Sequence, residues 1–394
     1  MTPKKGNSIC QITPFLYPYP GGQEVHTYML SRSLARIGWK VSIVTTNFPV
    51  GKTYEKVDGI EIYRTRMILN PIDNPITPSM LPILQKIDAD VFHAHSYWNF
   101  STNVACFVSK LKKIPFIITS HGYQPFRYFV GKFLRTFYLK TIGGYTLSNL
   151  DKMVLYHPQD KNILMSLGIP EKKIEIIPNA VSLDEFNPII DGTDILETYD
   201  LNKSKRILFV GRLIKRKGCR FIIKAMPEIL RTFPDAKLIV VGNGPQEAQL
   251  KNLVKKLGIA DSVLFLGYIP PLGETLNKIY AISDVLVLPS LDECMSRVIL
   301  EAMSMRKPIV TTDAWYSKWL VQPGEIAAIL VNPKETEQLA NAVIRVLQDS
   351  TLAMNLATKG RQLIEDRYNW EKIAKQLTKI YGKCIEEKRQ QLTL

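Results

Sequence analysis

The sequence predicts an α/β protein built from two doubly wound, Rossmann-like domains. The chain has 394 residues, and because single domains usually contain about 100–200 residues, this length predicts two of them. Short apolar runs alternate with segments of helical period along both halves of the chain, which is typical of parallel sheets covered by helices. The alternation restarts at Arg206 after a looser stretch of residues 187–202, and this restart separates the two domains.

The predicted strands are apolar along most of their length, as expected for strands buried on both faces of a parallel sheet. In the first half of the chain they are residues 8–15, 41–46, 59–65, 90–95, 116–121, 152–157 and 174–179. In the second half they are residues 206–212, 236–244, 263–269, 284–290, 308–313 and 327–332.

The segments between the strands have the spacing of amphipathic helices. Val25, Met29 and Leu34 recur at helical spacing, and Gly38 follows where the helix is expected to end. The same character recurs in residues 221–232, 246–257 and 336–347. We predict an N-terminal domain of residues 1–190, a C-terminal domain of residues 203–365, and a C-terminal helix within residues 366–394 that packs back on the N-terminal domain.

The composition is that of a globular protein with an excess of basic residues. The net charge of +15 indicates an anionic partner, such as phosphate groups, a lipid surface or nucleic acid, or else a basic surface that serves solubility only. No apolar run reaches the roughly 18–20 residues that span a membrane, and no secretory signal is apparent. The five cysteines form no Cys-x-x-Cys pair, which favours a reducing compartment. These features predict a cytoplasmic location.

Glycines and cations follow the predicted strands, where ligands bind in open α/β sheets. Gly21 and Gly22 follow the first strand and open the first helix, where they form either a phosphate-binding turn or an ordinary flexible turn. Gly211 and Arg212 end the strand of residues 206–212, and Lys217 follows soon after. Two cations at a strand end can hold a diphosphate, although a run of charges is most often a solvated loop.

Two further segments that follow strands contain candidate binding residues. Gly242 and Gly244 end the strand of residues 236–244, where they form either a nucleotide-binding loop or a simple tight turn. Glu293 follows the strand of residues 284–290, and Glu301 lies in the next helix. A carboxylate on this helix can accept two hydrogen bonds from a ribose, and one in the preceding loop can bind sugar hydroxyls. Two glutamates at this spacing also occur often by chance.

Three histidines fall near strand ends in the first half of the chain. His121 ends the strand of residues 116–121, where it can bind a sugar hydroxyl, stabilise charge or serve a structural role only. His93 and His95 share one strand, and we interpret them as pointing to opposite faces of the sheet. This interpretation argues against a two-histidine metal site, and no metal ligand is predicted.

Eight segments keep one order along almost the whole chain. They are GGQEVH (residues 21–26), HAHS (93–96), TSHGY (119–123), IIPNAVSLDEFNP (176–188), LFVGRLIKRKG (208–218), VVGNGP (240–245), FLGYIP (265–270) and PSLDECMSRVILEAM (289–303). In this order they resemble glycosyltransferase family 4, the retaining enzymes of the GT-B fold. The VGRL…KG and E-x7-E segments are the most specific part of the resemblance.

The resemblance implies two Rossmann-like domains that face each other across a cleft. It implies transfer of a hexosyl group (mannose, glucose or N-acetylglucosamine) from a UDP- or GDP-sugar to a glycan or lipid-linked acceptor, with retention of anomeric configuration. Arg212 and Lys217 would bind the donor diphosphate and stabilise it electrostatically as it departs. No cofactor and no divalent metal are expected, because these cations neutralise the phosphate charge.

The resemblance also implies roles for residues in both halves of the chain. Glu301 would bind the donor ribose, and Glu293 would bind hydroxyls of the donor sugar. Gly22 would offer its backbone near the phosphate, and His121 would contact the donor sugar. A front-face mechanism fits, in which the departing phosphate helps to deprotonate the acceptor.

The chain departs from the family pattern after the E-x7-E helix. Family members usually have a TDVGG-x-x-E loop there, whereas residues 312–319 read TDAWYSKW, with Trp315 and Tyr316 in place of glycines. Cys294 also follows Glu293 where glycine is common. The loop without glycine is similar to that of some phosphatidylinositol mannosyltransferases. GGQEVH and HAHS resemble the enzyme that starts glycosylphosphatidylinositol anchors with N-acetylglucosamine. Both relatives use lipid acceptors.

The sequence disfavours three functions other than hexosyl transfer. A sugar-nucleotide epimerase or a phosphorylase on a similar fold is disfavoured by the full set of family motifs. A basic nucleic-acid binder is disfavoured because no known nucleic-acid-binding motif is present. A non-catalytic protein that only binds sugar nucleotides is disfavoured because Arg212, Lys217 and both glutamates are intact.

One basic segment predicts contact with a membrane. Residues 91–150 contain seven Lys or Arg and no Asp or Glu. Within them, Arg127–Lys140 has the pattern of an amphipathic helix, with Phe129, Phe133 and Phe137 on one arc and basic residues mainly on the other. Such a helix suits an anionic lipid surface, although its apolar arc can equally be a core face. We therefore expect a protein that lies on the cytoplasmic face of the membrane.

Overall fold

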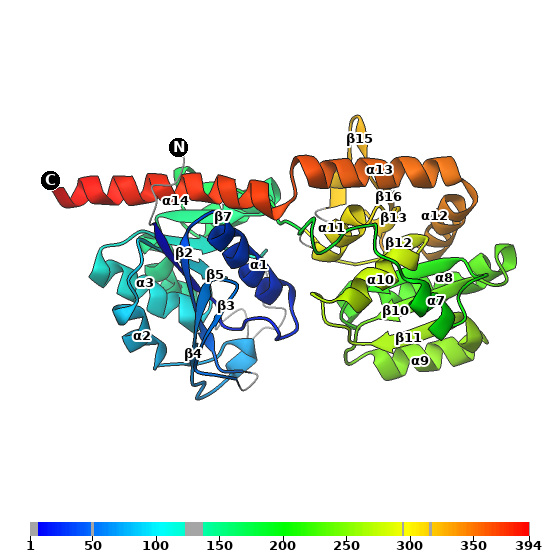
Figure 1. Cartoon of the computed structure of the whole chain (residues 1–394), viewed down its shortest axis with the longest axis horizontal. Helices are drawn as coiled ribbons and strands as arrows, with labels where there is room; N and C mark the ends of the chain where they lie inside the picture. The colour runs from blue at the N-terminus through cyan, green and yellow to red at the C-terminus, as the bar shows by residue number, and fades with distance from the viewer. Residues whose placement is uncertain (1–6, 49–50, 123–136, 294, 315–316, 394) are drawn as a thin grey trace. The chain divides into compact units, whose positions relative to one another are not determined.

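The computed structural model describes residues 7–48, 51–122, 137–293, 295–314 and 317–393 (Figure 1). The chain folds into two compact units. Unit 1 contains Met1–Pro178 and Trp370–Leu394, and unit 2 contains Asn179–Asn369. The chain therefore passes into unit 2 once and returns to unit 1 for its last helix, α14 (Trp370–Thr393).

Unit 1 is built on an eight-stranded sheet with the order β3-β4-β2-β1-β5-β6-β7-β8. Every neighbouring pair is parallel except β3 and β4, which are antiparallel. The strands are β1 (Ser8–Ile12), β2 (Lys40–Thr46), β3 (Tyr54–Val57), β4 (Ile60–Thr65), β5 (Val91–His95), β6 (Phe116–Thr119), β7 (Lys152–Leu155) and β8 (Ile174–Ile176). All residues of β1, β5 and β6 are buried, which explains why their sequences are nearly continuous apolar runs.

Helices connect the strands of unit 1. They are α1 (Gly22–Arg36), η1 (Pro71–Asp73), α2 (Met80–Lys86), α3 (Phe100–Lys112), α5 (Ile142–Asn149), η2 (Pro158–Asp160), α6 (Lys161–Ser166) and η3 (Glu171–Lys173). Helix α14 packs against α1 (Figure 1). From α14, the buried Tyr381 stacks edge-on against Trp39, with 5.6 Å between ring centroids. The C-terminal helix is thus part of the core of unit 1.

Unit 2 contains a six-stranded, fully parallel sheet with the order β11-β10-β9-β12-β13-β16. Its strands are β9 (Arg206–Val210), β10 (Lys237–Val241), β11 (Val263–Gly267), β12 (Val285–Leu288), β13 (Ile309–Thr312) and β16 (Ile329–Val331). A separate two-stranded antiparallel pair is formed by β14 (Val321–Gln322) and β15 (Glu325–Ile326).

The helices of unit 2 alternate with these strands. They are α7 (Thr193–Thr198), η4 (Lys215–Lys217), α8 (Cys219–Thr232), α9 (Glu247–Lys256), η5 (Ala260–Ser262), α10 (Glu274–Ile282), α11 (Arg297–Ser304), η6 (Ser317–Leu320), α12 (Thr336–Gln348) and α13 (Ser350–Asp366). The amphipathic helices α8 and α12 pack against each other. The predicted fold class, two doubly wound Rossmann-like α/β domains, is confirmed.

Each predicted strand is present, and most end earlier than predicted because their last residues form the loops at the carboxyl edge of a sheet. The structural division of the chain differs from the predicted one, since unit 2 already begins at Asn179. The Val181 N–H donates to the Tyr368 carbonyl (3.0 Å), and the Ser304 hydroxyl donates to the Phe186 carbonyl (2.7 Å). These bonds hold residues 181–186, which were predicted to belong to the N-terminal domain, to unit 2.

Among the described helices, none is both long enough and apolar enough to span a bilayer.

Candidate functional site

The loops after β9 and β10 of unit 2 lie side by side at the carboxyl edge of the sheet. The Leu213 N–H donates to the Asn243 carbonyl (2.8 Å) and the Gly211 N–H donates to Val241 (2.9 Å). A side chain on Gly242 would place its Cβ 2.0 Å from the Gly211 carbonyl oxygen, which no residue other than glycine avoids. Gly242 is therefore required by the packing of the two loops, whether or not a nucleotide binds there.

Gly244 is required by the packing of the same two loops. Its Cβ would lie 2.7 Å from the Leu213 carbonyl oxygen, and its φ of +156° is one that side chains rarely adopt. Both glycines predicted for a nucleotide-binding loop thus have a sufficient structural reason within unit 2.

Gly218 brings the basic turn of η4 against the end of β12. Its φ is +71°, and an added Cβ would lie 1.9 Å from the Pro289 carbonyl oxygen. The Leu291 N–H donates to the Arg216 carbonyl (2.7 Å) and fastens the two loops together. Residues that are distant in the sequence therefore meet at this edge of the sheet.

Lys217 and Glu293 form an ion pair at this meeting point. The ammonium nitrogen of Lys217 lies 2.5 Å from Glu293 Oε2, and both side chains are mostly buried, with 14% and 15% of their surface exposed. The Ser290 hydroxyl donates to the same carboxylate oxygen (3.1 Å). Arg212, in the same loop as Lys217, is exposed and makes no ion pair with any residue that the structure describes. Of the two cations predicted to bind the diphosphate, Lys217 is thus paired and Arg212 is not paired with any described residue.

Glu301 lies inside unit 2 on α11, where only 1% of its surface is exposed. The Tyr280 hydroxyl donates to its Oε2 (2.8 Å), and an Arg297 guanidinium nitrogen lies 2.8 Å from its Oε1. The Arg297 contact lacks hydrogen-bond geometry, so Oε1 accepts no hydrogen bond from the described residues. Burial raises the pKa of the Glu301 carboxyl, and the charge of Arg297 opposes this shift.

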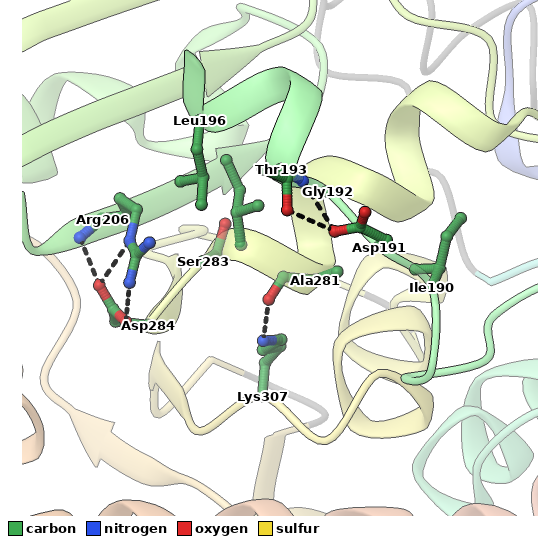
Figure 2. Close-up of a pocket in the computed structure, with 11 residues that line it drawn as sticks. Ile190, Asp191, Gly192, Thr193, Leu196, Arg206, Ala281, Ser283, Asp284 and Lys307 are labelled. Atoms are coloured by element: carbon green, nitrogen blue, oxygen red, sulfur yellow. Dashed lines mark hydrogen bonds and ion pairs between the residues drawn. The ribbon is translucent and has the colours of Figure 1, made fainter. Parts of the chain in front are cut away.

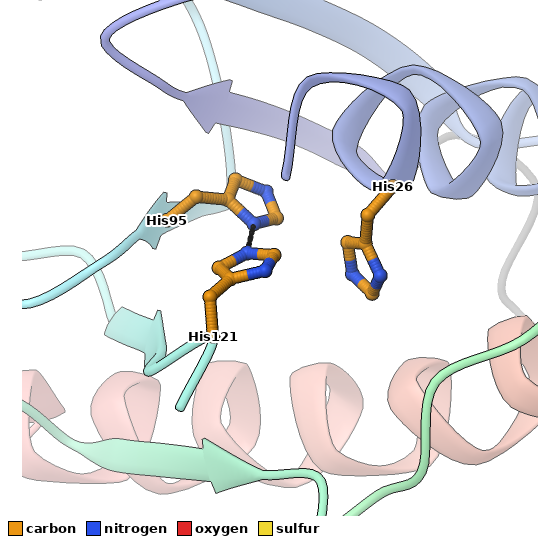
Figure 3. A group of neighbouring side chains, drawn as sticks. All are labelled: His26, His95 and His121. Carbon is orange, nitrogen blue, oxygen red and sulfur yellow. Dashed lines mark hydrogen bonds between the residues drawn. The ribbon is translucent and has the colours of Figure 1, made fainter. Parts of the chain in front are cut away.

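Three histidines converge at the carboxyl edge of the sheet in unit 1 (Figure 3). His26 lies on α1, His95 ends β5, and His121 follows β6; one nitrogen from each ring lies within 4.8 Å of the others. The sequence interpretation of His93 and His95 was wrong. Residues two apart in a strand point to the same face, and the rings of His93 and His95 lie 4.8 Å apart between centroids.

The convergent rings are joined by hydrogen bonds. His95 Nδ1 lies 2.8 Å from His121 Nε2, and His95 Nε2 lies 2.8 Å from Gln11 Oε1. The Tyr156 hydroxyl lies 2.7 Å from His121 Nδ1 and 3.1 Å from His26 Nδ1. Burial, followed by the neighbouring histidines, lowers the pKa of both His95 and His121 well below the usual value. Both rings are therefore neutral near pH 7, and both nitrogens of His121 are occupied.

Two family models match most of the chain, and between them they leave its two ends and residues 186–193 unmatched. The model described as Glycosyltransferase Family 4 matches residues 20–185, and the model described as Glycosyl transferases group 1 matches residues 194–363. The chain is a GT-B glycosyltransferase. This places it among the hexosyltransferases, as the resemblance implied.

Similar proteins agree with this assignment. An uncharacterized glycosyltransferase of Methanocaldococcus jannaschii is 28% identical over 95% of the chain and 99% of that protein. A phosphatidylinositol N-acetylglucosaminyltransferase subunit of Saccharomyces cerevisiae is 24% identical over 95% of the chain and 83% of that protein. The structure of Anabaena HepE in complex with UDP-glucose matches with a TM-score of 0.77 and 17% identity, over 95% of the chain and 99% of HepE.

The glycosyltransferase has two glycines at the start of α1 with different surroundings. A Cβ on Gly21 would lie 2.0 Å from a carboxylate oxygen of Glu24, so Glu24 covers this glycine. A Cβ on Gly22 would meet nothing within 4 Å. Packing therefore does not require glycine at position 22, and the space beside it is open.

Gln11 and Tyr156, which complete the histidine cluster of the glycosyltransferase, were not predicted from the sequence. Neither carries a motif signal. Gln11 is a single polar residue in the otherwise apolar β1, and that interruption was the one available sign. The predicted helix over Arg127–Lys140 falls mainly outside the described residues, as do Cys294, Trp315 and Tyr316.

A cavity of about 260 Å³ lies in unit 2, away from the predicted donor loops (Figure 2). Its lining includes Arg206, which begins β9, and Asp284, which precedes β12. Arg206 donates to both carboxylate oxygens of Asp284 (3.0 and 2.8 Å). The Lys307 ammonium donates to the Ala281 carbonyl (2.5 Å). The cavity thus sits at the amino ends of the strands, and it contains none of the predicted site residues.

Proposed function

We propose that the chain is a retaining, nucleotide-sugar-dependent hexosyltransferase whose donor binds at the carboxyl edge of the unit 2 sheet. The observation that carries this proposal is the group formed by Arg212, Lys217 and Glu293. It combines an exposed cation, a second cation and a carboxylate within two loops that are fastened together. Cations suit a diphosphate, and a carboxylate suits sugar hydroxyls.

In this proposal the two cations act on the departing diphosphate. Arg212 has no competing carboxylate among the described residues, so it meets the phosphate first. Lys217 is held in position by Glu293 and adds charge without a large loss of side-chain freedom. Electrostatic stabilisation by fixed groups is strongest where negative charge develops. The departing phosphate then takes the proton of the acceptor hydroxyl on the same face of the sugar.

The two glutamates bind different parts of the donor in this proposal. Glu293 uses Oε2 for Lys217 and Ser290, which leaves Oε1 for a sugar hydroxyl. Glu301 accepts a ribose hydroxyl through Oε1, the oxygen that lacks a hydrogen bond in the described residues. A buried acceptor left without a donor is costly, and a ribose hydroxyl would satisfy it.

Two residues of unit 1 keep the roles in donor binding that the family resemblance implies. The open space beside Gly22 allows the backbone at the start of α1 to approach a phosphate group. His121 follows β6 with a left-handed φ of +54°, a strained conformation that often marks functional positions. We propose that His121 contacts the donor sugar, as the family resemblance implies.

We further propose UDP-N-acetylglucosamine as the donor and a phosphatidylinositol-type lipid as the acceptor. The yeast relative is named for transfer of N-acetylglucosamine to phosphatidylinositol, and the HepE structure holds UDP-glucose. Incubating the purified protein with phosphatidylinositol and each of several UDP- and GDP-sugars tests this directly. We expect a glycolipid only with UDP-N-acetylglucosamine, and proton NMR of the product should show the α-anomer. Transfer from another donor, or a β-linked product, would contradict the corresponding part of the proposal.

The proposed reaction needs no divalent metal. Within the described residues, the one group of three potential metal ligands is the histidine cluster of unit 1, and no such group contains Glu293. Turnover should therefore persist in EDTA. Loss of turnover with EDTA, restored by Mg²⁺ or Mn²⁺, would contradict this point.

Exposed apolar and basic side chains of unit 1 support the proposed contact with anionic lipid. Phe107 and Leu111 lie one helical turn apart on α3 and are about half exposed (47% and 57%). Phe137 and Ile142 are also exposed, at 63% and 60%. Exposed lysines flank these side chains at positions 113 and 140. Apolar side chains with adjacent lysines suit the surface of an anionic bilayer.

Co-sedimentation with vesicles that contain anionic lipid tests this surface. The wild-type protein should pellet at low salt, and a Lys113→Glu/Lys140→Glu variant should remain in solution. The matched control is Lys255→Glu/Lys256→Glu, which makes the same change of charge on α9 of unit 2. Equal loss of binding in both variants would show that net charge, and not this surface, determines binding.

A further inference from the structure

The hydrogen bonds around the three histidines of unit 1 define where each proton lies. We call Gln11, His95, His121, Tyr156 and His26 the histidine network. A neutral imidazole has one N–H donor and one unprotonated acceptor nitrogen, and an amide oxygen can only accept. Since each contact in the network joins two named atoms, the donor of every bond follows from these rules.

Gln11, at one end of the histidine network, is fully buried on β1. Its Oε1 faces His95 Nε2 at 2.8 Å, so His95 Nε2 carries a proton and donates. The neutral His95 ring then accepts at Nδ1, and His121 Nε2 must donate to it (2.8 Å, Figure 3). The position of each proton therefore determines which atom donates in the next hydrogen bond.

The assignment continues through Tyr156 to His26. Because His121 donates from Nε2, its Nδ1 accepts the proton of the Tyr156 hydroxyl (2.7 Å). The hydroxyl has no second proton, so at the remaining contact His26 Nδ1 donates to the Tyr156 oxygen (3.1 Å). All four bonds therefore point in one direction, from His26 toward Gln11.

We propose that Gln11 is a positioning residue that sets the proton on every ring of the histidine network and thereby fixes the tautomer and orientation of His121. Its consequence for turnover rests on the proposed function, in which His121 contacts the donor sugar. A glutamine suits this role because its amide oxygen accepts a proton donor without adding charge. The residue lies at the far end of the network from His26, and within the network it acts through His95.

A single substitution should reverse the network. In Gln11→Glu, the carboxylate would hold His95 as an imidazolium, which donates from both nitrogens. His121 would then accept at Nε2 and donate from Nδ1 to Tyr156. The Tyr156 hydroxyl would in turn donate to His26 Nδ1. His95 takes up one proton from solvent, its bond to position 11 keeps its direction, and the other three bonds of the network reverse.

NMR of the full chain, labelled with ¹⁵N in histidine, reads the tautomers directly. In the wild type we expect N–H at Nε2 of His95 and His121 and at Nδ1 of His26. In Gln11→Glu we expect His95 to be doubly protonated and His121 to carry its proton at Nδ1. Thr119→Val is the matched control: its hydroxyl contacts His93 Nε2 (2.8 Å), so the tautomers of His95 and His121 should not change.

Several outcomes would overturn the proposal. They are the opposite tautomers in the wild type, unchanged tautomers in Gln11→Glu, and a stoichiometric bound metal that replaces the bond between His95 and His121. If Gln11→Glu does not fold, Tyr156→Phe provides the second test. It removes the acceptor of the His26 Nδ1 proton, so His26 should leave its Nδ1–H tautomer while His95 keeps its proton at Nε2.

Kinetics separate this inference from the proposed function. With the donor that the wild type uses, Gln11→Glu should lower kcat by about 10- to 100-fold, the usual effect of losing a partner that orients a histidine, with a smaller change in KM. A protein with the expected tautomers that transfers no sugar would refute the proposed function only. An active protein with the opposite tautomers would refute only the role of Gln11.

Discussion

The carboxyl edges of the parallel strands differ in electrostatic character between the two sheets. In unit 2 this edge carries the exposed Arg212 and the ion pair of Lys217 with Glu293. In unit 1 it carries neutral rings joined by hydrogen bonds, and all five histidines of the chain belong to this unit. Unit 2 therefore offers charge that is available to a ligand, whereas unit 1 offers geometry that is fixed internally. Substitutions that remove a charge should therefore impair the function of unit 2. A fall in pH, which protonates histidines, should destabilise unit 1.

The largest expected effect is the loss of turnover when Arg212 is removed. Arg212→Ala should lower kcat by ~10²–10³-fold, the usual cost of losing one fixed group at developing negative charge. The unfolding temperature should not change, because this exposed side chain makes no ion pair with the described residues. Arg231→Ala, an arginine that is 75% exposed on α8 of the same unit, is the control and should retain full activity. Near-normal turnover in Arg212→Ala would remove this residue from the donor site.

Lys217→Ala should lower turnover to a similar extent and also destabilise unit 2. The substitution leaves the mostly buried Glu293 carboxylate without its ion partner, and an unpaired group of this kind costs about 1–3 kcal/mol. Denaturant unfolding measures this loss. The double variant Lys217→Met/Glu293→Gln should regain stability without regaining activity. If it regains both, the ion pair is structural only.

As the pH falls, unit 1 should lose folding stability at a higher pH than unit 2. Burial lowers the pKa of His93 to about 3, and it lowers the pKa values of His95 and His121 well below 6.5. The unfolded chain binds protons on these rings below pH 6.5 and the folded chain does not. Their contribution to stability is complete above pH 6.5 and is lost as the pH falls toward the folded-state values, by up to about 1.4 kcal/mol per histidine for each pH unit.

Hydrogen exchange compares the two units in one sample. Between pH 7 and pH 5, and after correction for the intrinsic exchange rate, β5 and β6 should lose protection while β9 and β12 keep theirs. Unit 2 contains no histidine, so it serves as the internal control. Equal loss in both units would show that titration of the buried histidines does not govern acid stability.

The hydroxyl of Tyr280 should affect the stability of unit 2 in a way that depends on pH. It donates to the buried Glu301, and Tyr280→Phe leaves that oxygen without this donor. We expect a loss of about 1–3 kcal/mol, together with a further rise in the pKa of Glu301. Because that pKa is already raised by burial, the loss should be smallest at low pH, where the carboxyl is protonated, and should grow as the pH rises. A pH-independent loss would mean that Glu301 stays neutral throughout.

The comparison also shows which features the sequence can predict. The parallel strands were predictable because burial on both faces demands continuous apolar residues, as in β1 and β9. The edge strand β3 was not, since Tyr54–Val57 is largely exposed and lacks an apolar run. Glycines 242 and 244 were found by pattern, but their cause, contact with a neighbouring loop, depends on the register of β9 and β10.

The two sites were only partly predictable, because their residues come together from distant parts of the sequence. Lys217 and Glu293 were each identified from a motif, but their ion pair forms because Gly218 packs on Pro289. Gln11 and Tyr156 belong to no motif, and they join the histidines only because β1, β5, β6 and β7 are neighbours in the sheet. Strand order is a property of the whole fold, so no local pattern could have revealed these partners.

The smallest expected effect on stability comes from Gly22, and it has the opposite sign to the others. Gly22 is the first residue of α1, its φ is not positive, and an added Cβ would meet nothing within 4 Å. Gly22→Ala should therefore stabilise unit 1 by about 0.4–1 kcal/mol, because alanine loses less backbone freedom on folding. Gly382→Ala on α14 is the matched control, since its Cβ is equally unobstructed. Both variants should unfold at slightly higher temperature, but only Gly22→Ala should raise the KM for the donor, because only there would the new methyl group occupy space that we assign to a phosphate. An unchanged KM in Gly22→Ala would show that the donor does not approach the start of α1.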